Sequence, residues 1–410
     1  MPSSESVLLR AARWLTLGSA VSVLFSIAAC QILLALAFAA LLFSGAKLRV
    51  PPVWLPLGLF LLATLVSLAL SDNPAGGLPQ IRKFFVFLEL LVVFSTLGNL
   101  VLIRRLFLCW AGVGAVLALR GFVQFAAKLR EAHALGQNFY DFYVPARITG
   151  FMSHWMTYSG QEMFVLLMLG AFLFFAPGVG RRAWLWCVCG GMMVVALILG
   201  FTRGVWLAAG ISGIYLIWGW RRAVALAAPA ILLLGVLVAP SWVRERFTSI
   251  LKPSKVDSNA FRMVTRRTGI EMIRAHPWFG LGPEGVKYQF DRYVPRDIPR
   301  PLPDGWYGHL HNIYLHYAAE RGIPAMLILM WFLGRILYDF LRGLRGLAPG
   351  RSDARFVLQG AVAVVIAILI EGFFELNLGD SEVLTMFLVV VGCGYAALEA
   401  IRKPEVKAVG

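Results

Sequence analysis

The most reactive residues of this chain lie in one polar stretch, H-L-H-N-I-Y-L-H-Y-A-A-E-R-G, which begins at His309 and leads into an apolar run. His311 is expected in the first turn of a helix there, where the positive end of the helix dipole disfavours imidazolium. A neutral imidazole can accept a proton from a hydroxyl group, so His311 is the candidate general base. His309, Asn312 and Glu320 are candidate supporting residues, and Glu320 is expected to pair with the arginine that follows it.

Arginines form the second candidate group. The turn G-F-T-R-G-V-W, residues 200–206, joins two apolar runs, and Thr202 is a plausible N-cap for the second. Arg203 would then lie at a helix N-terminus, where free N–H groups favour an anion. A later amphipathic stretch, expected to lie on the membrane, carries Arg262, Arg266 and Arg267. Because guanidinium binds phosphate in a bidentate manner, these arginines are candidates for holding a phosphate-bearing ligand.

The pattern predicts neither a metal site nor a nucleotide loop. His309 and His316 lie two and five residues from His311, and no cysteine or carboxylate stands at ligand spacing. The five cysteines all fall in apolar runs, and the glycines at 280, 282 and 285 precede no Gly-Lys-Ser/Thr. We therefore expect no cofactor, no metal and no nucleotide.

The elements that must position these residues are membrane helices. Of the 410 residues, 59% are hydrophobic and 15% charged, and the mean hydropathy is +0.74. Repeated apolar runs of about 20 residues predict an all-α integral membrane protein, because helices that span a membrane satisfy their own backbone hydrogen bonds. Residues 15–45 could form one long helix or two short ones. We expect about twelve spans: 14–28, 30–46, 52–71, 83–99, 105–126, 157–176, 183–200, 202–219, 222–240, 311–341, 355–376 and 381–401.

Twelve spans place the short arginine- and lysine-rich connections and both termini on one side, which the positive-inside rule makes the cytoplasm. The chain then divides into a bundle of nine spans (1–240), a large periplasmic loop (241–310) and a bundle of three spans (311–410). The loop carries twelve basic residues against seven acidic ones. It should meet the two other outer segments, 127–156 and 200–203, over one cavity. This location excludes nucleic acid as a partner and makes membrane lipids neighbours.

At these residues the sequence resembles the O-antigen ligase and polymerase superfamily of bacterial envelope enzymes. Three pieces carry the resemblance: the T-R-G turn, the R…M-I-R-A-H-P-W-F-G-L-G stretch, and H-N-x-x-L-x-x-x-x-E-x-G from His311. The resemblance covers about residues 195–325. It implies a GT-C-like glycosyltransferase of the bacterial inner membrane, with its site facing the periplasm. Such an enzyme would transfer a glycan from undecaprenyl pyrophosphate to a sugar hydroxyl of lipid A-core, with inversion and without metal.

The resemblance also assigns roles. The family base maps to His311, the turn arginine to Arg203 and the loop arginine to Arg262. Because the family commonly has an aromatic residue where this chain has Arg266, the loop assignment stays open among Arg262, Arg266 and Arg267.

Several functions share this pattern. Within the superfamily, a ligase is favoured over a polymerase of repeat units and over a protein O-oligosaccharyltransferase, because the chain has one large outer loop and no additional C-terminal region. From a different class, a transporter of an anion such as bicarbonate would show the same hydropathy. Against transport, the sequence shows no inverted repeat and its polar residues gather on one side.

The first prediction concerns topology. Reporter fusions at Gly410 and within residues 285–300 should report opposite sides of the membrane, with Gly410 cytoplasmic, because the positive charges and the twelve-span count agree. Finding both fusions on the same side would contradict the orientation.

Overall fold

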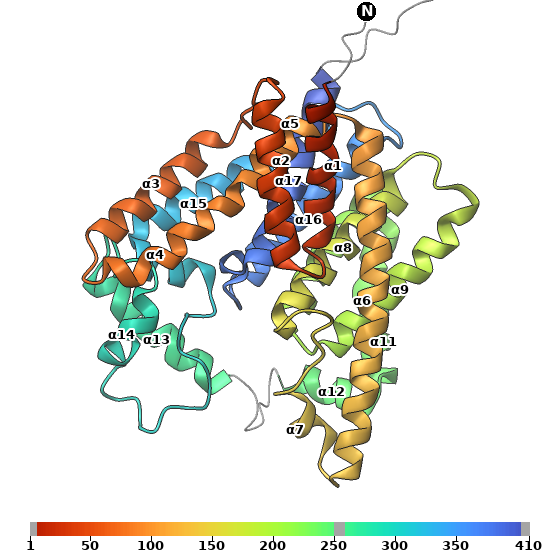
Figure 1. Cartoon of the computed structure of the whole chain (residues 1–410). Coiled ribbons are helices and arrows are strands. Elements are labelled where there is room, and N and C mark those ends of the chain that lie inside the picture. The colour runs from red at the N-terminus through yellow and green to blue at the C-terminus, as the bar shows by residue number, and fades with distance from the viewer. Residues whose placement is uncertain (1–5, 250–258, 403–410) are drawn as a thin grey trace, which may run out of the picture.

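The computed structural model describes residues 6–249 and 259–402, and these are helical with no strand among them (Figure 1). The expected all-α fold is therefore confirmed. The helices are α1 (Val7–Ser22), α2 (Ile27–Phe43), α3 (Trp54–Ala69), α4 (Pro74–Arg82), η1 (Lys83–Phe87), α5 (Leu88–Thr96), α6 (Leu100–Ala134), α7 (Phe139–Tyr143), α8 (Trp155–Phe175), η2 (Gly180–Arg182), α9 (Ala183–Leu199), α10 (Arg203–Trp220), α11 (Arg222–Val238), α12 (Ser241–Thr248), α13 (Asn259–Ala275), α14 (Gly285–Tyr293), α15 (Ile313–Arg345), α16 (Asp353–Glu371), η3 (Asn377–Gly379) and α17 (Ser381–Arg402).

Six helical segments of the described chain are long and apolar enough to cross a membrane: α6, α8, η2 with α9, α15, α16 and α17. Three more, α2, α3 and α11, are apolar but shorter. The chain is thus a multi-pass membrane protein by the length and composition of its helices. Each expected span coincides with a helical segment, while the count of twelve stays a prediction.

The apolar stretch 15–45 forms two helices, as the twelve-span count expects. α1 ends at Ser22, and Ser26 begins α2 by accepting a hydrogen bond from the backbone N–H of Ala29 at 3.3 Å. The two helices then pack against each other as a hairpin. A serine that satisfies free N–H groups is enough to restart a helix inside an otherwise continuous apolar run.

α15 is not the single straight span expected over 311–341. The helix breaks at Gly322, whose φ of 84° and ψ of 161° are not helical, and Pro324 follows. The break leaves helix carbonyls unpaired, and the turn after α13 satisfies them: Leu281 N–H donates to Ala319 O at 2.9 Å and Gly282 N–H to Glu320 O at 2.8 Å. Two backbone hydrogen bonds therefore connect the short first part of α15 to the loop of residues 241–310.

Residues 241–310, the loop expected on the outer side of the membrane and called the outer loop below, contain α12, α13 and α14. Residues 250–258, with Lys252 and Lys255, lie outside the described residues, as do Lys403 and Lys407 at the C-terminal end. The expected amphipathic helix is α13, and its position on the membrane stays a prediction. Part of its apolar face packs on protein, because Val264 and Met272 form a buried cluster with side chains of α14 and the start of α15.

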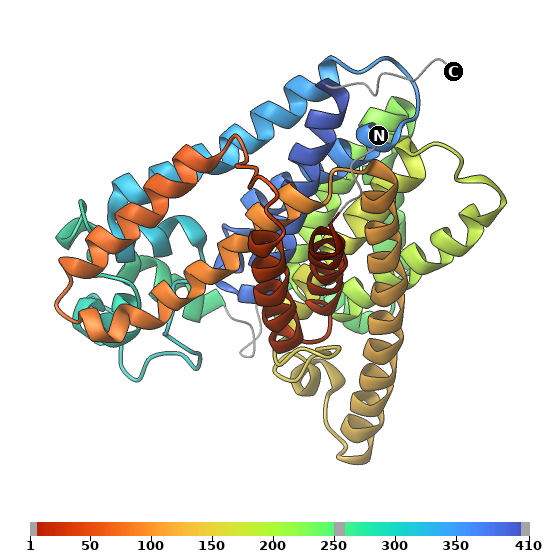
Figure 2. The same ribbon diagram turned by 45° about the horizontal axis from the view of Figure 1, so that its top comes forward.

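The two ends of the helical bundle carry different elements. The beginning of α1 and the end of α17 lie at one end of the bundle, while α7, α12, α13 and α14 lie toward the other (Figures 1 and 2). This grouping agrees with the expectation that the three outer segments meet.

The second prediction tests the break in α15. Gly322→Ala should lower the free energy of unfolding by at least about 1 kcal/mol, because alanine is strained at positive φ and its Cβ would lie 2.0 Å from Trp278 O. Gly334→Ala, in the same helix with open space around it, should be neutral or stabilising. Thermal unfolding of the purified proteins in detergent measures both. Equal transitions for the two variants would contradict the tight contact.

Candidate active site

His311 does not lie in the first helical turn, so that expectation is wrong. Asn312 is the N-cap of α15, and its side chain accepts a hydrogen bond from Leu315 N–H at 2.9 Å. This cap leaves His311 just before the helix, with a positive φ of 48°. The His311 ring therefore precedes the helix instead of belonging to its first turn.

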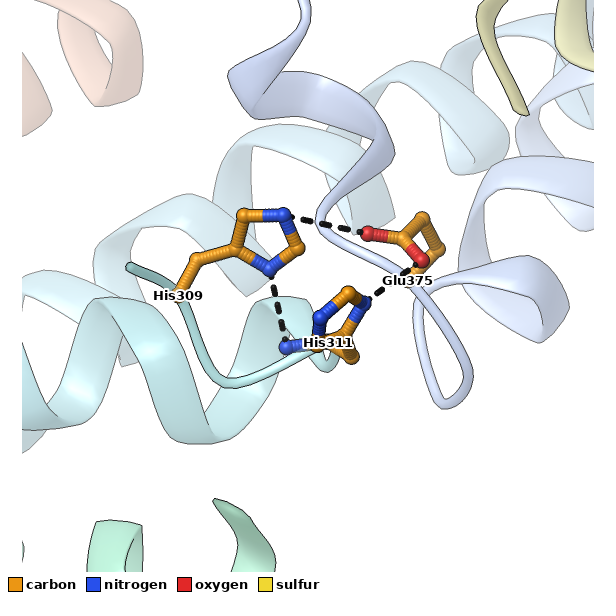
Figure 3. Close-up of side chains that lie close together, drawn as sticks. All are labelled: His309, His311 and Glu375. Carbon is orange, nitrogen blue, oxygen red and sulfur yellow. Dashed lines mark hydrogen bonds and ion pairs between the residues drawn. The ribbon is translucent and has the colours of Figure 1, made fainter. Parts of the chain in front are cut away.

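A carboxylate orients His311 instead. Glu375, in the connection between α16 and α17, places Oε2 2.9 Å from His311 Nδ1 (Figure 3). Burial alone would raise the pKa of Glu375, but His311, His309 and Arg262 together lower it to about 2. An ionised carboxylate can only accept hydrogen bonds, so Nδ1 of His311 carries the proton. In the neutral form of the ring, the lone pair lies on Nε2.

Nε2 of His311 is buried and has no hydrogen-bond partner among the described residues. The ring of His309 lies 3.9 Å from the His311 ring, and the ring of Phe261 lies edge-on at 5.0 Å. The one nitrogen that could accept a proton is thus unoccupied and bordered by two rings. We expect a hydroxyl group to reach it when one of these rings moves.

Three hydrogen bonds hold the segment that carries Glu375. The backbone carbonyls of residues 372–374 each accept one, from Ile313 N–H at 2.8 Å, from Asn312 Nδ2 at 3.1 Å and from Arg262 Nη1. The start of α15 and the helix α13 therefore fix the position of the carboxylate. Glu375 was not among the residues predicted from the sequence, where it stood at the end of the span expected over 355–376. The sequence did hold one signal for Glu375: the predicted topology places the end of that span on the outer side, where the other candidate residues were expected.

His309 supports the same carboxylate. Its Nε2 lies 3.6 Å from Glu375 Oε1, and its Nδ1 accepts a hydrogen bond from His311 N–H at 3.2 Å. Burial lowers the pKa of His309 to about 3, although the Glu375 charge opposes this shift. His309 is therefore neutral at physiological pH, and it braces the His311 backbone.

The same three side chains could hold a metal ion. One ligand atom each from His309, His311 and Glu375 lies within 4.8 Å of the others. The spacing argument against metal was incomplete, because Glu375 is 64 residues from His311 in the sequence. The separation of 2.9 Å is a hydrogen bond. Two ligands of a tetrahedral zinc ion would stand roughly 3.3 Å apart, so an ion would have to replace that bond.

Arg203 begins α10, as predicted, with Thr202 at the N-cap position. The Thr202 side chain makes no cap hydrogen bond, however, because its hydroxyl donates to Gly200 O at 3.0 Å. The guanidinium of Arg203 contacts Ser249 O at 3.0 Å and Asn259 Oδ1 at 2.6 Å. Arg203 therefore connects the tight turn to the described residues on both sides of segment 250–258.

The three candidate loop arginines separate in the structure. Arg262 faces the site, with Nη2 3.9 Å from Glu375 Oε2. Arg267 pairs with Asp297 at 2.8 Å on the outer surface. Arg266 is exposed and makes no hydrogen bond or ion pair within the parts of the chain that the structure describes. Of the three, the geometry brings only Arg262 to the candidate base.

Two further arginines approach this site. Arg147, from the segment between α7 and α8, has its pKa lowered first by burial and also by the positive charges of Arg246, Arg262 and Arg203. Arg246 is buried and donates to Phe201 O at 2.9 Å, which holds the tight turn. We call these four residues the arginine cluster. Arg147 was missed because one arginine in a long outer segment has no local motif.

Glu320 lies apart from this cluster. Its carboxylate is 3.3 Å from His316 Nε2, while the guanidinium of the neighbouring Arg321 lies over the Tyr317 ring at 4.5 Å. The expected pair of Glu320 with Arg321 is thus replaced by a pair one helical turn back. Glu320 and Arg321 are both buried beside the break in α15. The ion pair of Glu320 with His316 therefore lies inside this segment and not at the candidate base.

The site lies across a segment that comparison with known families identifies. Residues 188–330 match the O-antigen ligase family. The resemblance seen in the sequence is therefore confirmed over roughly a third of the chain. No curated protein matches the chain. The matched segment contains Arg203, Arg262 and His311, whereas Arg147 and Glu375 lie outside it in the sequence.

The third prediction concerns the arginine cluster. Inorganic pyrophosphate should raise the thermal unfolding temperature of the wild-type protein, because an anion relieves the repulsion among its like charges. Arg262→Lys should lose most of that rise, since an ammonium cannot form the bidentate contact. Arg266→Lys, on the same helix but outside the cluster, is the matched control and should keep it. Equal shifts in the two variants would contradict the assignment of Arg262.

Proposed function

We propose that this protein is an O-antigen ligase, an inverting glycosyltransferase that moves a glycan from undecaprenyl pyrophosphate to a sugar hydroxyl of lipid A-core. The reaction would take place at the periplasmic face of the bacterial inner membrane. One observation carries the proposal: the unoccupied ring nitrogen of His311, oriented by an ionised carboxylate, adjoins the arginine cluster. The family match over residues 188–330 supports the same chemistry.

The base in this mechanism is the pair of His311 and Glu375. The acceptor hydroxyl gives its proton to Nε2 as its oxygen attacks the anomeric carbon of the donor. The imidazolium that forms is stabilised by the carboxylate already bonded to Nδ1–H. Attack from the face opposite the leaving group inverts the anomeric centre, and no covalent intermediate is needed.

The arginine cluster receives the leaving group. As the glycosidic bond breaks, negative charge grows on the undecaprenyl pyrophosphate, and guanidinium groups already in place stabilise it. Arg203 and Arg262 are the residues we assign to this contact, with Arg147 beside them. Arg246 stabilises the tight turn by donating a hydrogen bond to Phe201 O.

We propose that the reaction needs no metal ion. The His311–Glu375 hydrogen bond occupies the atoms that an ion would use, and the guanidinium of Arg262 lies 3.9 Å from the same carboxylate oxygen. A neighbouring positive charge disfavours a divalent cation. The arginine guanidinium groups stabilise the negative charge of the leaving group, so no metal ion is needed as a Lewis acid.

A ligase accounts for the site better than the alternatives. An anion transporter needs a polar route to both sides of the membrane, whereas the His311 pair and the arginine cluster come from segments that are all expected on one side. A polymerase of repeat units would use the same chemistry. The single large outer loop favours ligation, and the products distinguish the two.

The fourth prediction tests the base. His311→Ala should lower transfer by about 10² to 10⁴, the usual contribution of a general base. Glu375→Gln should lower it by at least about tenfold, because the amide keeps the hydrogen bond but loses the charge that stabilises imidazolium. A purified assay with lipid-linked donor and EDTA present measures both. Pyrophosphate should still raise the unfolding temperature of His311→Ala.

A strain lacking the gene provides the test of the product. Loss of a ligase leaves long glycan on the lipid carrier and only short lipopolysaccharide on a gel, whereas loss of a polymerase leaves core with one repeat unit. His311→Ala should fail to restore long lipopolysaccharide. Near-normal turnover of His311→Ala would exclude it as the base, and loss of wild-type activity in EDTA with rescue by a divalent ion would overturn the metal-free mechanism.

A further inference from the structure

A groove of about 610 Å³ opens on the surface beside the candidate active site. Three segments form it: the turn between α3 and α4, the helix α14, and the chain just before His309. Its volume lies in the range of small-molecule binding sites. Its lining residues are Asp72, Asn73, Lys287, Tyr288, Gln289, Phe290, Asp291, Arg292, Trp306, Tyr307 and Gly308.

Ring contacts connect this groove to the base. The indole of Trp306 packs edge-on against His309 with ring centres 4.8 Å apart, and His309 lies 3.9 Å from His311. On the other side, Tyr307 contacts Phe261 at 4.8 Å, and Phe261 also borders His311. A molecule that fills the groove therefore ends close to the reacting hydroxyl.

Two exposed aromatic side chains, Trp306 and Tyr288, line the groove. Trp306 is 60% exposed although it packs on His309. It folds back over Gly308, where a Cβ would lie 2.1 Å from the indole ring. Opposite, Tyr288 is 55% exposed and rests against Gly76 of α4. Two large aromatic side chains thus stay open to solvent at fixed positions, although their burial elsewhere would be favourable.

The polar part of the lining is balanced in charge. The lining carries two carboxylates, Asp72 and Asp291, and two cations, Lys287 and Arg292, with Asn73 and Gln289 as carboxamides. Gln289 Oε1 is buried without a hydrogen-bond partner among residues 6–249 and 259–402. A buried carbonyl oxygen without a partner is costly, and a hydroxyl donor from a ligand would satisfy it.

This chemistry selects the ligand class. A strongly anionic group would prefer the arginine cluster, and an acyl chain would not enter a groove lined by charges. A sugar offers hydroxyl groups to carboxylates and carboxamides, and its C–H face packs on an aromatic ring. We propose that this groove binds a short oligosaccharide segment of the substrate and so holds it beside His311.

The proposal rests on the proposed function for the identity of the glycan. The donor glycan and the core of the acceptor share the same hydroxyl-rich chemistry, so either could occupy the groove. Lipid-free core oligosaccharide and a lipid-free O-antigen fragment are the two probes. Whichever probe loses binding when the groove is changed identifies the occupant.

Kinetics of the purified full-length protein provide the first arm of the test. Tyr288→Ala, which lies away from the histidines, should raise the KM for one glycan substrate by about tenfold, equivalent to roughly 1.4 kcal/mol, with kcat little changed. Trp306→Ala should raise the same KM and also lower kcat, because it supports His309. Trp278→Ala is the matched control, since Trp278 is 70% exposed and does not line the groove.

Direct binding provides the second arm and separates the two proposals. Each probe is titrated by calorimetry into the His311→Ala protein, which needs no turnover. Binding that is lost in His311→Ala/Tyr288→Ala and kept in His311→Ala/Trp278→Ala supports the groove even where wild-type transfer fails. Absence of binding by both probes, or binding and KM values within about twofold of the parent proteins in the Tyr288 variants, overturns it.

Discussion

Removing an ionised carboxylate from water costs several kcal/mol unless positive or hydrogen-bonding groups replace the solvent, and Glu375 is almost fully buried. Its replacements come from separate parts of the chain: the rings of His311 and His309 before α15, and the guanidinium of Arg262 on α13. The last hairpin, the outer loop and α15 can therefore adopt few relative positions without leaving a buried charge unpaired. The orientation of the base and the docking of the outer helices are two effects of this one ion.

The arginine cluster brings repulsion between like charges, whereas Glu375 is held by attraction to groups of opposite charge or to hydrogen-bond donors. Arg147, Arg203, Arg246 and Arg262 come from four segments, and their charges repel one another in a partly buried place. Backbone carbonyls hold several of them, as Phe201 O does for Arg246. Phe201 itself has a positive φ of 49°, a conformation that costs a non-glycine residue about 1 to 3 kcal/mol. His311 has the same strained φ just before its N-cap, so both functional turns store strain that the surrounding packing maintains.

Local pattern was enough to select His311, Arg203 and Arg262 as candidates, because each stands where a polar motif interrupts or adjoins an apolar run. Glu375 and Arg147 could not be found in this way, since their roles depend on contacts across the fold. The neutral ring expected for His311 was assigned to the helix dipole, yet Asn312 took the N-cap and a carboxylate set the tautomer. The break in α15 was missed because hydropathy continues through it, although Gly322 and Pro324 marked it.

The seclusion of His311 Nε2 also affects reactions with water. The nitrogen is shielded from bulk solvent by the rings of His309 and Phe261, so a water molecule diffusing past the mouth of the site does not meet a base that could activate it. A sugar anchored nearby can bring enough contact energy to displace a ring, whereas a single water molecule cannot. In the proposed reaction, the bond between glycan and pyrophosphate in a bound donor would thereby be protected from hydrolysis until the acceptor arrives.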